Sequence, residues 1–176
     1  MKARLAPLFA AAAFSFTACA TLADHQVLSA TETVDINART DTVWAAMRDF
    51  NALPVWHPAV AKSRIVNGEN NKPGAVRELG IKDGPLIFDE LVALNDERMY
   101  FVYKLVESPL PLTDYQSTVA VKPKGQGSQV IWTVTFRRKN PTANPPADQS
   151  DAAGIDLLQN VYRAGLDNLK KAVEAK

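Results

Sequence analysis

Hydrophobic and polar residues alternate along much of the chain, which is the pattern of strands that bury one face. The clearest case is the stretch 129–138, whose apolar residues share one face: Val130, Trp132, Val134 and Phe136. Residues 31–36 alternate in the same way and predict an opening strand. Turn signals separate five further predicted strands, at residues 60–66, 75–81, 86–95, 99–107 and 115–122.

Two other regions have the spacing of helices. The first follows Thr40 and Asp41, either of which can cap a helix, and Pro54 interrupts it before a short turn that carries Trp56 and His57. Its apolar residues recur at steps of four and three: Val43, Met47 and Phe50.

The second helical region is the long carboxy-terminal stretch that follows a proline-rich linker at 140–146. Asp148 or Ser150 can cap it. An apolar stripe then runs along one face: Ile155, Leu158, Tyr162, Leu166, Leu169 and Val173. Gly165 widens the stripe and lets the helix lie close to whatever it covers.

The order of strand, two short helices, six strands and long helix predicts an α+β protein with a helix-grip fold. In this fold a curved antiparallel sheet of about seven strands wraps the carboxy-terminal helix. Each side chain buried against that helix contributes roughly 1.5–3 kcal/mol. The stripe is therefore expected to be the main source of stability, which leaves room for an unfilled cavity elsewhere.

The first residues have the features of an export signal. Lys2 and Arg4 precede an apolar run at 5–16 that is too short to span a bilayer, and small residues follow. Residues 1–23 are predicted to be the signal peptide, and 24–176 a single domain in the periplasm or outside the cell. Cys19 either leaves with the signal or, in a lipoprotein-like alternative, carries a lipid anchor.

The charge excludes several classes of function. Without Lys2 and Arg4 the chain has 18 basic residues, from 20 in total, against 19 acidic ones, and no long run of either sign. Nucleic-acid binding needs a concentrated basic face and is not expected. No second apolar stretch is long enough to cross a membrane, and two histidines and one cysteine cannot build a histidine-rich or thiolate metal site. Neither a metal nor a cofactor is expected.

Candidate chemistry centres on His57 and Asp89. His57 suits proton transfer as a general base, but it can equally donate a hydrogen bond to a ligand or brace the Trp56 corner. Asp89 shares a strand face with Ile87 and Leu91, so its carboxylate either points inward, partnered by Tyr115, Ser117 or His57, or lies outward in solvent.

The connection at 108–112 is apolar and stiffened by two prolines, Pro109 and Pro111. An apolar exposed loop is a candidate lid or partner contact. A rigid turn packed on its own end of the sheet is the alternative.

Several segments resemble the START/Bet v 1-like superfamily, which includes the polyketide cyclase/dehydrase and lipid-transport proteins. The matching segments occur in order along residues 31–173: Val43-Trp44, Asp49-Phe50, Trp56-His57-Pro58, 94–98, 115–117 and 165–169. Within the superfamily the chain is similar to MxaD-like periplasmic proteins at 56–63, 145–146 and 162–167. That resemblance implies an accessory role in a redox system such as bacterial methanol oxidation, with a periplasmic dehydrogenase or cytochrome as partner.

The resemblance also implies a partly polar internal pocket. Alignment with the plant hormone receptors of the superfamily brings His57 to a ligand-gripping lysine, Asp89 to a pocket carboxylate, and residues 110–112 to a mobile latch. The lysine is replaced and the gate loop is not reproduced around Gly84 and Pro85, so hormone recognition is not implied. The expected ligand-binding residues are Trp56, His57, Asp89, Tyr103, Tyr115, Ser117, Trp132, Val161 and Gly165, and the expected lid residues are Gly84, Pro85, Leu110, Pro111 and Leu112.

Two functions remain open from the sequence. The first is an exported, non-enzymatic protein that binds a small hydrophobic or amphipathic ligand in an internal cavity or serves a redox-enzyme partner. The alternative is a polyketide cyclase/dehydratase-like enzyme that uses His57 and Asp89 as acid and base.

Overall fold

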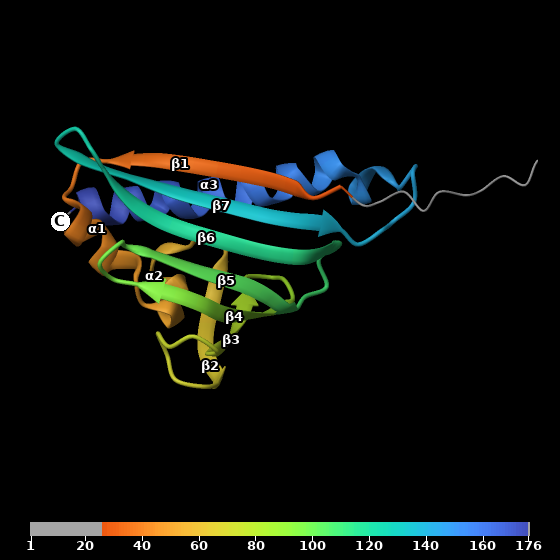
Figure 1. Ribbon diagram of the computed structural model, residues 1–176, viewed down its shortest axis with the longest axis horizontal. Coiled ribbons are helices and arrows are strands. Elements are labelled where there is room, and N and C mark those ends of the chain that lie inside the picture. Colours follow the sequence, from red (N-terminus) through yellow and green to blue (C-terminus); the bar gives the residue numbers. More distant parts are fainter. Residues whose placement is uncertain (1–25, 176) are drawn as a thin grey trace, which may run out of the picture.

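The computed structural model describes residues 26–175, in which one long helix lies across the inner face of an antiparallel sheet (Figure 1). The strands are β1 (Leu28–Ile36), β2 (Val60–Asn67), β3 (Val76–Ile81), β4 (Leu86–Asn95), β5 (Tyr100–Glu107), β6 (Leu112–Lys124) and β7 (Gly127–Arg138). The helices are α1 (Thr40–Met47), α2 (Leu53–Trp56) and α3 (Asp151–Glu174), with the 3₁₀ turns η1 (Phe50–Ala52) and η2 (Ala147–Gln149). These elements confirm the predicted helix-grip fold.

The sheet order is β1-β7-β6-β5-β4-β3-β2. Strands β2 to β7 therefore form a meander, and β1 joins its far edge by pairing with β7 from Leu28 opposite Phe136 to Ile36 opposite Ser128. The predicted alternation of β7 is confirmed, because Val130, Val134 and Phe136 are fully buried beneath α3.

Helix α3 begins as predicted at Ser150, whose Oγ accepts a hydrogen bond from the Ala153 N–H at 3.2 Å. It packs mainly on β1. Its predicted stripe is the buried face: Leu158, Tyr162, Leu166, Leu169 and Val173. Figure 1 shows α1 and α2 at the end of the sheet near the carboxy-terminus of α3.

The cap of α1 differs from the prediction. The N-cap is Arg39, which makes no side-chain cap hydrogen bond, rather than Thr40 or Asp41. Asp41 lies in the first turn and forms an ion pair with Arg39 at 2.8 Å. Phe50 follows α1 in η1, and its side chain is fully buried.

Strand bounds agree with the prediction to within two residues, except at β1 and β6, which begin earlier than expected, at Leu28 and Leu112. In β6 the cause is a register shift between Thr113 and Gln116, where Asp114 has a φ of 50°. Such a bulge interrupts the alternation by which a strand is recognised in a sequence.

Within residues 26–175, no helix is long and apolar enough to span a bilayer. The predicted signal peptide and Cys19 lie outside the described residues.

Candidate functional site

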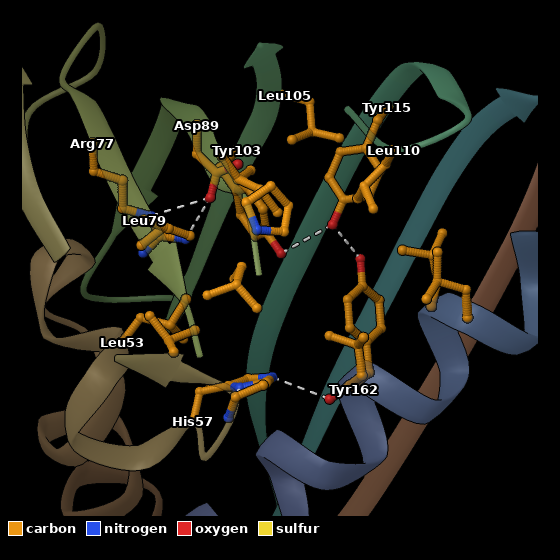
Figure 2. A pocket seen from close by; sticks show the side chains of 18 of the residues that line it. Leu53, His57, Arg77, Leu79, Asp89, Tyr103, Leu105, Leu110, Tyr115 and Tyr162 are labelled. Atoms are coloured by element: carbon orange, nitrogen blue, oxygen red, sulfur yellow. Dashed lines mark hydrogen bonds and ion pairs between the residues drawn. The ribbon is translucent and has the colours of Figure 1, made fainter. Parts of the chain in front are cut away.

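A cavity of about 220 Å³ lies between α3 and the inner face of the sheet (Figure 2). Its walls are mainly apolar, with contributions from β3, β4, β5, α2 and α3. The apolar lining residues include Leu53, Leu79, Ile87, Leu105, Leu110 and Val161. The polar or aromatic ones are His57, Arg77, Asp89, Tyr103, Tyr115, Trp132 and Tyr162.

The two predicted lid segments contribute one lining residue each. Pro85, in the β3–β4 hairpin, and Leu110, in the β5–β6 connection, line the cavity and keep exposure to solvent. Gly84 and Pro111 do not line it. Leu112 was wrongly placed in a loop: it is buried as the first residue of β6, opposite Arg138.

His57 is buried at the end of α2, where its extended backbone turns the chain into β2. Its Nε2 lies 3.1 Å from the carbonyl oxygen of Val161 on α3, and its Nδ1 accepts from the Ala59 N–H at 3.2 Å. These partners fix a neutral ring with the proton on Nε2. Burial lowers the pKa of His57 below its ordinary value.

Both ring nitrogens of His57 are thus hydrogen-bonded to backbone groups. Of the three roles considered for His57, this arrangement fits the one in which it braces the Trp56 corner. A general base needs a lone pair directed at the substrate, and here that lone pair accepts from Ala59. His57 presents its ring to the cavity as a wall. The ring also occupies the space beside Gly165, which does not line the cavity itself: a Cβ added there would meet it.

Asp89 points inward from β4, so the outward, solvated alternative is wrong. Its predicted partners were also wrong. Arg77, the residue directly opposite on β3, donates to Asp89 Oδ2 from Nε at 3.2 Å and from Nη2 at 2.9 Å. Both side chains are almost completely buried.

Arg77 is held by more than its carboxylate. Its Nη1 donates to the carbonyl oxygen of Phe50, and its guanidinium lies 3.9 Å from the centre of the Phe50 ring. Burial raises the pKa of Asp89, and the adjacent guanidinium opposes that rise. The pair therefore adds polarity to one wall of the cavity without adding net charge.

Five side chains form a hydroxyl cluster that begins beside this pair, at Tyr103, and extends to α3: Tyr103, Tyr115, Ser117, Trp132 and Tyr162. The Tyr115 hydroxyl lies 2.5 Å from that of Tyr162 and 3.2 Å from that of Tyr103 (Figure 2). Trp132 Nε1 donates to the Tyr103 hydroxyl at 3.1 Å and to Ser117 Oγ at 2.9 Å. Ser117 donates in turn to the Thr133 carbonyl at 3.0 Å.

The hydroxyl cluster satisfies its own polar atoms. Ser117 donates its hydroxyl proton to the Thr133 carbonyl, so its Oγ can accept from the Tyr162 hydroxyl at 3.1 Å. The Tyr115 hydroxyl then donates to Tyr162, and the Tyr103 hydroxyl donates to Tyr115. Burial raises the pKa of Tyr103, and it raises the pKa of Tyr115 and Tyr162 well above 10.0. The cluster is neutral over the physiological range.

The predicted site residues therefore divide into two groups. The structure brings His57, Asp89, Tyr103, Tyr115, Trp132 and Val161 to the cavity. Trp56, Ser117 and Gly165 lie behind its walls. Trp56 packs edge-on against Trp132 with ring centres 5.6 Å apart, and its buried Nε1 has no hydrogen-bond partner among the described residues.

The predicted site omitted two polar lining residues, Arg77 and Tyr162. It also omitted nine apolar ones: Leu53, Ala59, Val60, Leu79, Ile81, Ile87, Leu105, Leu157 and Leu158. Tyr162 was assigned to the apolar stripe of the last helix, although a phenol in such a stripe needs a polar partner when it is buried. Arg77 stands between Val76 and Glu78 in the strand predicted at 75–81. A buried arginine needs a carboxylate, and the next strand contains Asp89.

Residues 27–174 match the family model described as "Polyketide cyclase / dehydrase and lipid transport". That match spans nearly all of the described residues. The chain belongs to this family.

Two bacterial proteins of known structure support the assignment to the polyketide cyclase/dehydrase and lipid-transport family. An uncharacterised protein from Bacillus thuringiensis is 33% identical, with a TM-score of 0.71, over 83% of this chain and 98% of that one. The protein XoxI from Bacillus cereus is 32% identical, with a TM-score of 0.71, over 82% of this chain and 94% of that one.

A more distant likeness shows the fold alone. The Zhui aromatase/cyclase from Streptomyces sp. R1128 is 15% identical, with a TM-score of 0.70, over 85% of this chain and 94% of that one.

Proposed function

We propose that this protein is an exported binding protein that holds a small hydrophobic or amphipathic ligand between α3 and the sheet. The observation that carries the proposal is the cavity of about 220 Å³, whose polar wall groups are largely paired with one another. A protein interior normally packs without voids of this size, because an empty apolar cavity costs stability. Membership of a lipid-transport family supports the same function.

The ligand is expected to be small. Cavities for drug-sized ligands span about 300–1,000 Å³, and this one is below that range. A water molecule occupies about 30 Å³ of liquid, so the cavity has the volume of roughly seven water molecules.

We infer an accessory role in a periplasmic redox system such as methanol oxidation, with a dehydrogenase or cytochrome as partner. The resemblance to MxaD-like proteins at 56–63 and 162–167 and the 32% identity to XoxI support this role. The export signal predicted at 1–23 supports the location.

Native mass spectrometry tests the binding function. The protein purified from its own compartment is expected to carry excess mass that denaturation releases. Val161→Phe places a ring in the cavity and should abolish that excess, whereas the matched control Val106→Phe, on an exposed position of β5, should retain it. A wild-type protein without excess mass, and without affinity for any apolar probe, would remove the proposal.

Cell fractionation and amino-terminal sequencing test the location. Cleavage after Ala23 would leave Asp24 as the first residue in a periplasmic fraction, whereas lipid anchoring would retain Cys19 in a membrane fraction. Recovery of the uncleaved chain from the cytoplasm would contradict export.

The cyclase/dehydratase alternative gains no support from the geometry. Its proposed base, His57, has both nitrogens bound to the backbone, and its proposed acid, Asp89, is paired with Arg77.

A further inference from the structure

One oxygen of Asp89 has no hydrogen-bond donor among residues 26–175. Both hydrogen bonds from Arg77 go to Oδ2, and no described residue donates to Oδ1. A carboxylate offers about four lone-pair sites, and an acceptor left unmatched away from water is unfavourable. Asp89 lies on the cavity wall, so a molecule in the cavity can reach this oxygen.

The hydroxyl protons and both ring nitrogens of His57 are already engaged by other protein groups. Each hydroxyl of the cluster donates to the next group in a chain of hydrogen bonds that ends at the Thr133 carbonyl. The two ring nitrogens of His57 are hydrogen-bonded to the backbone of Val161 and Ala59. Figure 2 shows Asp89 and Arg77 on the wall that faces Tyr115 and Tyr162. The cavity therefore offers carbon on most sides, and Asp89 Oδ1 is the carboxylate oxygen on its wall that accepts from no described residue.

We propose that the cavity selects ligands with a hydroxyl group, small uncharged alcohols or phenols whose O–H donates to Asp89 Oδ1. This assignment rests on the proposed binding function and specifies its ligand class.

Charge and hydrogen bonding disfavour the other head groups. A ligand carboxylate would meet the Asp89 carboxylate, and an ammonium group would meet the Arg77 guanidinium in a buried site. A hydrocarbon, ether or ketone has no proton to donate, so it would leave Oδ1 unmatched.

Isothermal titration calorimetry at pH 7 with three probes tests the assignment. We use 4-propylphenol, 4-propyltoluene and 4-propylbenzoate, because the first two have the same size and differ only in hydroxyl against methyl. The phenol is expected to bind at least about tenfold more tightly than the toluene, since only the phenol satisfies the carboxylate oxygen. The benzoate is expected to bind more weakly than the phenol.

Variants test whether the Arg77–Asp89 pair causes the selectivity for phenol over toluene. Asp89→Asn alone can fail to fold, because Arg77 would remain buried without a counter-charge. The double variant Arg77→Met/Asp89→Leu replaces the pair with apolar residues and should reverse the preference in favour of the toluene. Glu90 follows Asp89 on β4 and pairs with Lys104 of β5. Glu90→Gln is the control and should leave the preference for the phenol over the toluene unchanged.

The outcomes separate this assignment from the proposed function. Equal binding of phenol and toluene by the wild type would overturn the hydroxyl selectivity and leave the binding function standing. Absence of binding for all three probes would count against both. A double variant that keeps the tenfold preference would overturn the role of Asp89.

Discussion

The imidazole of His57 lies directly on the backbone of Gly165. A Cβ at Gly165 would come within 2.5 Å of His57 Cδ2 and 2.9 Å of its Nε2. A side chain of any size at this position would therefore push the ring away from α3 and lengthen its hydrogen bond to the Val161 carbonyl.

Gly165→Ala is expected to destabilise the fold by about 1–2 kcal/mol, because overpacking outweighs the better helix propensity of alanine. Urea unfolding measures the change. In a His57→Ala background the same substitution should cost less, since the two closest contacts are gone and only the Trp132 Cζ3 contact at 3.2 Å remains. An equal cost in both backgrounds would show that His57 is not the cause.

The stability of the protein should fall in acid because His57 is buried in its neutral form. Its folded pKa lies below the ordinary value of 6.5, so the unfolded chain binds the proton first. The contribution is complete above pH 6.5 and is lost as the pH falls through the folded pKa. Unfolding free energies at pH 8, 7, 6 and 5 are expected to decline more for the wild type than for His57→Gln.

Breaking the Arg77–Asp89 pair should be costly, whereas replacing both residues should not be. Asp89→Ala leaves a buried guanidinium and is expected to lower the free energy of unfolding by about 3–5 kcal/mol. Arg77→Met/Asp89→Leu should recover most of that loss, as measured by urea unfolding. Additive losses in the double variant would contradict the pairing.

Removing one hydroxyl should disturb the hydroxyl cluster without loss of ring packing. Tyr162→Phe keeps the stacking on Trp132, whose ring centre lies 4.2 Å away, but leaves Tyr115 without its closest partner. The expected cost is about 1–3 kcal/mol. Tyr100→Phe, at a partly exposed tyrosine of β5, is the control and should change stability by less than about 0.5 kcal/mol in thermal unfolding.

The fold could be predicted because each element carries a local signal. The alternation in β7 and the stripe of α3 depend only on which faces are buried, and Ser150 is a cap that needs no distant partner. The early start of β6 could not be predicted in this way, because the bulge at Asp114 breaks the period.

The candidate site was predictable only in part, because its contacts depend on strand register. The strand that carries Asp89 left open whether its carboxylate points inward or into solvent. Its partner depends on how β3 and β4 align, which sets Arg77 opposite it. The role of His57 depends on α3, more than a hundred residues later, since the Val161 carbonyl occupies its Nε2. Neither contact can be predicted from the residues next to Asp89 or His57 in the sequence.

The order of the strands also determines when the sheet can be completed during synthesis. Strand β1 is the first to be synthesised, yet its whole length pairs with β7, whose last residue is Arg138. In a nascent chain that ends before β7, the backbone N–H and C=O groups of Leu28–Ile36 lack the strand with which they pair in the folded protein. The outer edge of the sheet is therefore completed only once residues up to Arg138 have been synthesised.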